Sequence, residues 1–284
     1  MSSPKVILVG DTARASRHFG CQLVCETFRE QFERTGLELT RSFLMDLGEE
    51  GTWEKTVEGA DLVVINGEGS FHHGRYQKLL HLAEIRPVIL VNTVWEENPQ
   101  AKSLKKILFL AARESRSANE IRKNGVACKV VPDVLFASRR LLDYQPNDPG
   151  RGLGQTDSTV KDEIRLGPIR WRTRRGFSPK VLRLEIYLDK LCRYERLCIG
   201  RFHAAIAAAV LGRPFATWDS NTWKLRGLME DMGMEHLHFE YRKDARKAVP
   251  YKLNNRVRDF AHEARKRVER MFDQIASLAR EWAE

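Results

Sequence analysis

Short runs of apolar residues alternate with helix-like stretches along the first half of the chain, and this alternation constrains the fold more than any other feature. The run at 61–66, DLVVIN, places four apolar residues in succession, which leaves no polar face for water. Strands of this kind are typical of a parallel sheet covered by helices on both faces. The predicted strands cover residues 5–9, 61–66, 88–95, 107–112 and 128–131, and the predicted helical stretches cover 20–35, 53–58, 77–84, 99–106 and 115–123. The first half therefore predicts a Rossmann-like α/β layer.

The second half resumes the same pattern after an interruption. Residues 141–179 are rich in Pro, Gly and Arg, which predicts a linker followed by a long irregular stretch. Beyond it we expect strands at 196–199 and 215–218 and helices at 204–211 and 222–232. The second half is therefore predicted to form another Rossmann-like domain.

A final helix is predicted over 255–282, because apolar residues recur there at spacings of three and four. The stripe consists of Val257, Phe260, Ala264, Val268, Met271, Ile275, Leu278 and Trp282. We expect it to dock onto the body of the protein. The predicted division is an N-terminal Rossmann-like domain at 1–140, a C-terminal one at 141–254 and an amphipathic helix at 255–284.

The 284 residues carry a formal net charge of +10, from 48 Lys and Arg against 38 Asp and Glu. Most of the surplus lies in two blocks, since 161–184 holds eight basic and two acidic residues and 241–284 holds twelve and seven. Such a charge favours anionic partners. A non-catalytic nucleic-acid-binding protein is one hypothesis, but neither block has interleaved aromatics or a nucleic-acid-reading motif, so we expect no nucleic acid partner.

The cysteine content and the hydropathy of the chain indicate its cellular compartment. The five cysteines are scattered and odd in number, which is typical of a reducing compartment. No run approaches the roughly 18–20 apolar residues that cross a bilayer, and no apolar leader precedes the first predicted strand. We expect a cytoplasmic protein.

Polar and glycine residues follow the predicted strands, at the position where open parallel sheets bind ligands. In the first half they are Asp11, His18, Gly67, Glu68, Gly69, Ser70, His72, His73 and Arg113. In the second half they are Arg201, His203, Ser220, Asn221 and Lys224. Both halves are thus expected to present polar residues to a shared cleft.

Each of these residues also has a structural interpretation. The glycines of GEGSFHHG can serve a tight turn alone, and neither GxGxxG nor GxxxxGK[ST] is present. Arg113 can be an ion-pair partner, and Ser220 or Asn221 a helix cap. His203, two residues after Arg201 and at the start of an apolar helix, is the strongest single candidate, because an imidazole titrates near neutral pH. His81, His236, His238 and His262 are interpreted as structural.

Four ordered segments resemble the polysaccharide pyruvyltransferase family. They are GDT followed by HFGCQLV, DLVVINGEGSFHHG, ARESRSANEIRKNGV followed by VPDVLF, and IGRFHAAIAAAVLGRPFATWDSNTWKLRGLMEDMG. The resemblance covers most of the chain except the middle and the last helix. It implies a GT-B-like fold, in which two Rossmann-like domains with parallel sheets face a cleft. It also implies transfer of a pyruvyl group from phosphoenolpyruvate onto a sugar of a cell-surface polysaccharide or its lipid-linked precursor, with formation of a pyruvate ketal and without a metal or a further cofactor.

The resemblance assigns roles to matching residues. The Arg-x-His motif of the family falls on Arg201 and His203, and a family arginine falls on Arg113. Phosphoenolpyruvate carries a phosphate and a carboxylate, so Arg113 and Arg201 are expected to hold the donor. His203 is expected to act as general acid and base, with Glu68 or His72 as its counterpart.

The remaining candidates are expected around these groups. Lys224 and Asn221, with Ser220, are expected to orient donor or acceptor, and the loop residues Asp11, His18, Gly67, Gly69, Ser70 and His73 to border the acceptor. The basic surplus is interpreted as a face for a phosphate-linked acceptor or for the anionic inner surface of the cell membrane.

Two departures leave the donor open. The glycine turn of the family is here GEGSFHHG, and its usual acidic pair is replaced by FGCQ. An alternative is therefore a GT-B glycosyltransferase that uses a CMP-activated ulosonic acid such as Kdo, whose carboxylate the same arginines would hold. In that case Glu68 would be the base or the nucleophile.

Overall fold

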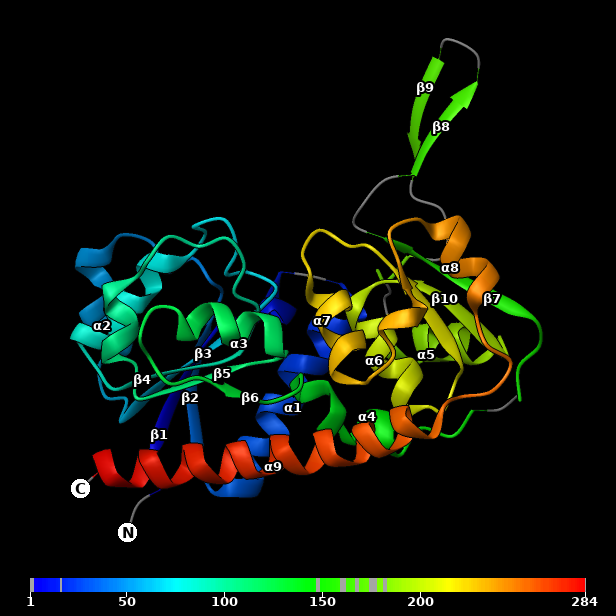
Figure 1. Cartoon of the computed structure of the whole chain (residues 1–284). Helices are drawn as coiled ribbons and strands as arrows, with labels where there is room; N and C mark the ends of the chain where they lie inside the picture. Colours follow the sequence, from blue (N-terminus) through cyan, green and yellow to red (C-terminus); the bar gives the residue numbers. More distant parts are fainter. Residues whose placement is uncertain are drawn as a thin grey trace. The chain divides into compact units, whose positions relative to one another are not determined.

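The computed structural model describes residues 3–15, 17–146, 149–158, 162–166, 169–173, 178–180 and 183–283. They form two compact units of mixed α/β structure (Figure 1). The first unit comprises residues 1–16, 24–137 and 264–284, and the second comprises 17–23 and 138–263. The short stretch 17–23 thus belongs to the second unit although its neighbours in sequence belong to the first. Part of the basic block 161–184 lies outside the described residues.

The first unit contains a sheet of six parallel strands in the order β2-β1-β3-β4-β5-β6. The strands are β1 Lys5–Val9, β2 Glu38–Phe43, β3 Leu62–Glu68, β4 Val88–Thr93, β5 Phe109–Ala112 and β6 Lys129–Val130. Every residue of β3, β4 and β5 is buried, which confirms the prediction of a covered parallel sheet. The edge strand β2, ELTRSF, was not predicted, because it exposes polar side chains and lacks an apolar run.

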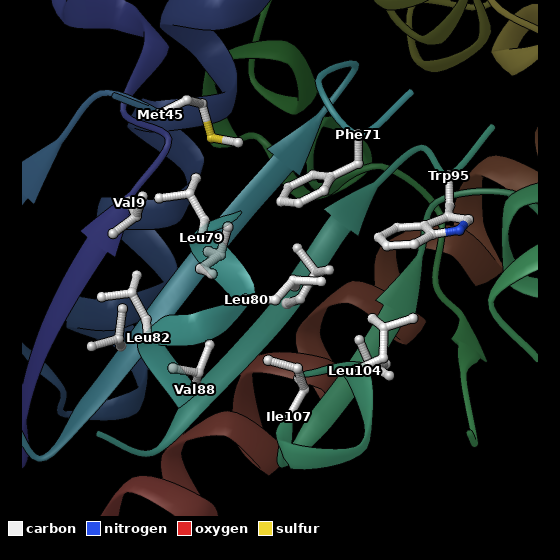
Figure 2. Close-up of a cluster of buried hydrophobic side chains, with 14 of the residues drawn as sticks. Val9, Met45, Phe71, Leu79, Leu80, Leu82, Val88, Trp95, Leu104 and Ile107 are labelled. Atoms are coloured by element: carbon white, nitrogen blue, oxygen red, sulfur yellow. The ribbon is translucent and has the colours of Figure 1, made fainter. Parts of the chain in front are cut away.

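Helices and apolar turns connect these parallel strands. The helices are α1 Phe19–Thr35, α2 Trp53–Val57 and α3 Ser115–Arg122, and the stretches Gln77–Glu84 and Lys102–Lys106 are 3₁₀ helices. Figure 2 shows the buried apolar cluster over the sheet, to which the first of these 3₁₀ helices contributes Leu79, Leu80 and Leu82. Phe71 and Trp95 stack there with ring centroids 5.8 Å apart. Burial of such side chains stabilises the unit by about 1.5–3 kcal/mol each.

The second unit contains a sheet of four parallel strands in the order β12-β11-β10-β7. The strands are β7 Leu153–Ser158, β10 Arg196–Gly200, β11 Phe215–Trp218 and β12 His238–Phe239. The helices are α4 Arg139–Leu142, α5 Leu184–Cys192, α6 Phe202–Val210, α7 Lys224–Asp231 and α8 Arg242–Ala248. A separate antiparallel pair joins β8 Asp162–Leu166 to β9 Ile169–Thr173.

The prediction of an irregular linker at 141–179 was wrong. Strand β7 lies within this stretch and pairs with β10 in the main sheet. Its sequence, LGQTDS, has one large apolar residue, yet Gly154 and the last three residues are buried. Tertiary packing therefore overrides a weak local strand signal.

The last helix, α9 Asn255–Ala283 (orange to red in Figure 1), confirms the predicted helix, but some residues of the predicted apolar stripe are not buried. Val268, Met271 and Ile275 are buried as expected, but Trp282 is 53% exposed. Phe272 is fully buried in the first unit, with its ring 5.3 Å from Phe28. Within the described residues, no helix has the length and apolar character needed to cross a membrane.

Replacing Phe272 with Ala should lower the free energy of unfolding by about 3–5 kcal/mol, because it leaves a cavity between α9 and α1. Urea denaturation followed by circular dichroism measures the loss. The matched control is Lys266→Ala at an exposed position of the same helix, which should stay within about 0.5 kcal/mol of the parent. Equal effects of the two substitutions would contradict this packing.

Candidate functional site

A buried hydrogen-bond network joins the carboxyl ends of the strands in the first unit. The Asn66 amide donates to the Gly10 carbonyl at 3.0 Å and to Glu68 Oε1 at 3.2 Å. Asn92 Nδ2 donates to Asn66 Oδ1 at 2.9 Å, and Thr12 Oγ1 donates to Glu68 Oε1 at 2.7 Å. Residues of β3 and β4 are thereby tied to the loop that follows β1 in one polar cluster.

The same network extends toward β5. Asn92 Oδ1 accepts from the backbone N–H of Val134 at 3.3 Å, and Asp133 Oδ1 accepts from that of Leu135 at 3.0 Å. Arg113 Nη1 donates to Asp133 Oδ2 at 3.1 Å, and both side chains are almost fully buried. Arg113 therefore has the ion-pair partner that its structural interpretation required, and its role toward a donor remains a prediction.

Two residues of this network have unusual backbone conformations. Glu68 has φ 39° and Asn92 has φ 53°, in the left-handed region that residues other than glycine rarely adopt. Such strain is concentrated at functional sites, where the surrounding structure holds it. Gly67 is needed next to Glu68, because a Cβ there would lie 2.3 Å from Thr93 Oγ1. The carboxylate of Glu68 is thus held at the end of β3 by strained backbone and by hydrogen bonds from Thr12 and Asn66.

The remaining loop candidates of the first unit form a turn. The backbone N–H of Ser70 donates to the Gly67 carbonyl at 3.0 Å, so the glycine-rich loop through Gly69 is a tight turn. His72 is buried, whereas His73 is half exposed and lies 2.9 Å from Glu97 Oε2 through its Nδ1. The two imidazole centroids are 5.0 Å apart.

Asp11 is fully buried and has a structural environment. Its Oδ2 accepts hydrogen bonds from Arg29 and, at 2.7 Å, from Ser42 Oγ. These partners tie the end of β1 to β2 and α1. Among the described residues, Asp11 Oδ1 has no hydrogen-bond partner.

The second unit carries a bidentate ion pair at the carboxyl edge of its sheet. Arg201 follows β10, and its Nε and Nη2 donate to Asp157 Oδ1 and Oδ2 at 2.8 and 2.7 Å. Asp157 lies near the end of the adjacent strand β7 and is buried. Sequence reasoning missed Asp157 because it assigned this stretch to a linker, and no local pattern marks the strand near whose end Asp157 lies.

His203 packs against the segment 17–23 within the second unit. The His18 and His203 rings meet edge-on with centroids 6.0 Å apart. Gly20 permits this approach, because a Cβ on it would lie 2.1 Å from His203 Nδ1. Phe19 fixes the segment, since its backbone N–H donates to the Pro179 carbonyl at 2.9 Å. His18, predicted beside the loop residues of the first half, therefore belongs with His203.

The environment of His18 keeps its ring neutral. Burial, together with the charges of His203, Arg201, Lys224 and Lys180, lowers the pKa of His18 from 6.5 to about 3. Its Nδ1 accepts the backbone N–H of Gly20 at 3.1 Å. The proton of the neutral ring is therefore on Nε2, which makes Nε2 a hydrogen-bond donor.

The loop after β11 supplies the remaining candidates. Lys224 Nζ donates to Asn221 Oδ1 at 2.6 Å, and Ser220 Oγ donates to the same oxygen at 3.2 Å. His238 Nε2 lies 2.9 Å from Asp219 Oδ1, and its other ring nitrogen lies 2.9 Å from a threonine hydroxyl of β11. Burial lowers the pKa of His238 in spite of Asp219. His238, which had no predicted site context, thus pairs with an aspartate at the sheet edge.

Known proteins offer a match in fold alone. The sequence matches no protein-family model and no curated protein. An uncharacterized protein from Klebsiella pneumoniae has a similar solved structure, with a TM-score of 0.54 and 14% sequence identity. The match covers 83% of this chain and 90% of that protein.

Among the described residues, no group of three His, Cys, Asp or Glu side chains is arranged to hold a metal ion.

Stability should decrease as the pH falls from 6.5 toward 3 because of His18. The pKa is lowered in the folded state, so the unfolded chain takes up the proton first in this window. The free energy of unfolding of the parent minus that of His18→Gln should be constant above about pH 7.5. Below about pH 6 this difference should fall, because acidification destabilises the parent through His18 and not the variant. Urea denaturation across this range measures it, and the same change at exposed His236 controls for loss of an imidazole. A pH-independent difference would rule out a buried neutral His18.

Replacing Gly20 with Ala should displace the His203 ring and lower the free energy of unfolding by about 1–3 kcal/mol, because the added methyl overlaps Nδ1. Thermal denaturation measures the loss, and the imidazole NMR signals of His203 should shift. Gly51→Ala is the control, since a Cβ there meets nothing within 4 Å. An unshifted His203 signal in Gly20→Ala would be inconsistent with this contact.

Proposed function

We propose that this protein is a member of the polysaccharide pyruvyltransferase family and transfers a pyruvyl group from phosphoenolpyruvate onto a sugar. The observation that carries the proposal is the group at the carboxyl edge of the second sheet, where His18 and His203 meet next to Arg201. Lys180 and Lys224 add positive potential at the same point, as the lowered pKa of His18 reflects. A donor that carries a phosphate and a carboxylate suits this combination of cations and imidazoles.

Asp157 gives Arg201 a fixed orientation. The bidentate pair uses Nε and Nη2, and among the described residues Nη1 makes no hydrogen bond. Nη1 can therefore donate to an oxyanion of the donor while Asp157 holds the guanidinium plane in place. Because the negative charge of Asp157 offsets the positive charge of Arg201, we assign much of the net attraction for the anionic donor to Lys180 and Lys224.

The two histidines have different roles in the proposed reaction. A sugar hydroxyl adds to C2 of phosphoenolpyruvate as a proton reaches the C3 methylene, which becomes a methyl group. A second hydroxyl then closes the ketal at C2, and the C2–O bond to phosphate breaks. One hydroxyl proton balances the proton taken up by C3, and the other leaves with phosphate. His203 accepts and returns these protons, while neutral His18 donates a hydrogen bond from Nε2.

The acceptor is proposed to be a sugar of a cell-surface polysaccharide or its lipid-linked precursor. The GT-B arrangement is part of the same proposal, because each of the two α/β units carries a parallel sheet with polar residues at its carboxyl edge. Glu68 or His72 would then assist the acceptor hydroxyl. Contact with the anionic inner face of a membrane would bring a lipid-linked acceptor within reach.

One observation favours the second candidate, a glycosyltransferase with a CMP-activated ulosonic acid donor. The carboxylate of Glu68 sits on strained backbone at the end of β3. A carboxylate that is held in this way suits a base or a nucleophile for a ketosidic centre.

The donor is identified by incubating the purified protein with phosphoenolpyruvate, CMP-Kdo or CMP-sialic acid and a panel of saccharide acceptors. Acceptor-dependent release of phosphate supports pyruvyl transfer. Acceptor-dependent release of CMP without phosphate would establish the glycosyltransferase instead. A new ketal methyl signal in the proton NMR spectrum of the acceptor identifies the product.

His203→Gln and Arg201→Lys should each lower kcat/KM for phosphoenolpyruvate by about 10²–10⁴-fold, since they remove the acid–base group and the bidentate geometry. The matched control is His236→Gln at an exposed histidine, which should keep full activity. Thermal denaturation of all three checks the fold. Full activity of His203→Gln in a well-folded protein would exclude its catalytic role.

A further inference from the structure

A cavity of about 570 Å³ lies at the edge of the six-stranded sheet in the first unit. Its walls come from β6, the edge strand of that sheet, from the end of α3 and from α9. It touches Phe109, the first residue of β5, whereas Arg113 follows the last residue of that strand. Lys129 and Val130 pair with Ala111 and Ala112, so the cavity extends along β5 beside the edge strand. In the described part of the chain, none of its lining residues takes part in the carboxyl-edge network described above.

Four basic side chains line the cavity, and no Asp or Glu is among its lining residues in the described part of the chain. Arg122 comes from α3, Lys129 from β6, and Arg267 and Arg270 from α9. Because Arg122 and Lys129 are far in sequence from Arg267 and Arg270, the fold itself brings the two pairs of charges to one place. The cavity therefore carries a concentrated positive potential.

The contacts of three of these cations leave their charge uncompensated. Arg122 donates through Nε and Nη2 to the Cys128 carbonyl at 3.1 and 2.7 Å. Lys129 Nζ donates to Gln274 Oε1 at 2.8 Å, and Arg267 donates to the Val130 carbonyl. Each acceptor is a neutral amide or peptide oxygen, so these bonds orient the cations without neutralising them.

Apart from Gln274, the other lining residues are apolar or, at Cys128, a thiol. Phe109 and Met271 are buried residues of the sheet and of α9, and the Lys129 ammonium lies 5.4 Å from the Phe109 ring centroid. Cys128 also lines the cavity, and burial raises the pKa of its thiol to about 11. The thiol is therefore protonated at neutral pH, and the wall offers no nucleophile.

We propose that this cavity binds a phosphate-bearing small molecule of nucleotide size, separately from the donor site of the proposed function. Cavities of about 300–1,000 Å³ hold ligands of that size. Arg122, Lys129, Arg267 and Arg270 meet the phosphates, and the apolar wall at Phe109 and Met271 covers the organic part. The proposed binding is non-covalent: no bond is formed or broken, and no metal ion is required.

Titration calorimetry on the full chain tests the proposal with three probes: ADP, inorganic pyrophosphate and adenosine. ADP should bind saturably, pyrophosphate more weakly because it lacks the organic part, and adenosine without detectable heat. Binding of pyrophosphate equal to that of ADP identifies a plain polyphosphate as the ligand chemistry and overturns the role of the apolar wall. No saturable binding of ADP or pyrophosphate overturns the site.

Lys129→Gln and Arg270→Gln should each weaken ADP binding about tenfold, the ratio expected for loss of one charge-assisted hydrogen bond. Both side chains are exposed, and thermal denaturation checks that each variant folds. The matched control is Lys266→Gln, which removes the same charge from α9 outside the cavity. If Lys266→Gln weakened ADP binding equally, the effect would come from the net charge of the protein and not from the cavity, and the proposal would be overturned.

One further comparison distinguishes binding of ADP in the cavity from binding of ADP at the donor site. ADP affinity should be unchanged in Arg201→Lys. Loss of ADP binding in Arg201→Lys, with full binding in Lys129→Gln, would place the nucleotide at the second unit and reject the cavity. Because these titrations need no turnover, they are independent of whether pyruvyl transfer is observed.

Discussion

Parallel pairing of fully buried strands is the constraint on which both units depend. Such strands leave no side-chain face for water, so their polar residues are confined to the ends. Parallel strands also need long crossovers, which bring successive carboxyl ends to the same edge. At the edge of the first sheet, Asn66, Asn92 and Glu68 satisfy one another where water is excluded. The sheet thus produces a dense polar cluster without any motif of a few adjacent residues.

A buried polar cluster of this kind is costly unless every member is bonded, because an unsatisfied buried group destabilises by about 1–3 kcal/mol. The left-handed backbone of Glu68 and Asn92 adds to that cost. Simple stability does not require such residues at these positions, since apolar residues could fill the same space. Their presence is the physical reason to associate this edge with function.

The parts of the fold that were predicted have strong local signals, and the parts that were missed lack them. Strands β1, β3 and β4 are runs of adjacent apolar residues, and helix α9 has apolar residues at regular spacing, so both signals are local in the sequence. Strand β7 is stabilised by pairing with β10, a contact that no local pattern reveals, and Asp157 was missed with it. The meeting of His18 with His203 joins residues 185 positions apart, so spacing alone could not predict it.

The distribution of charge refines what the net charge of +10 means. Arg113 and Arg201, the arginines expected to attract an anion, each form an ion pair with an aspartate, Asp133 or Asp157. Such pairs supply orientation more than net attraction. In contrast, Arg122, Lys129 and Arg267 are held by neutral oxygens and keep their full charge. Within the first unit, attraction and orientation are therefore carried by different cations: Arg113 is oriented by an ion pair at the strand ends, whereas the cations at the edge of β6 keep the charge that attracts an anion.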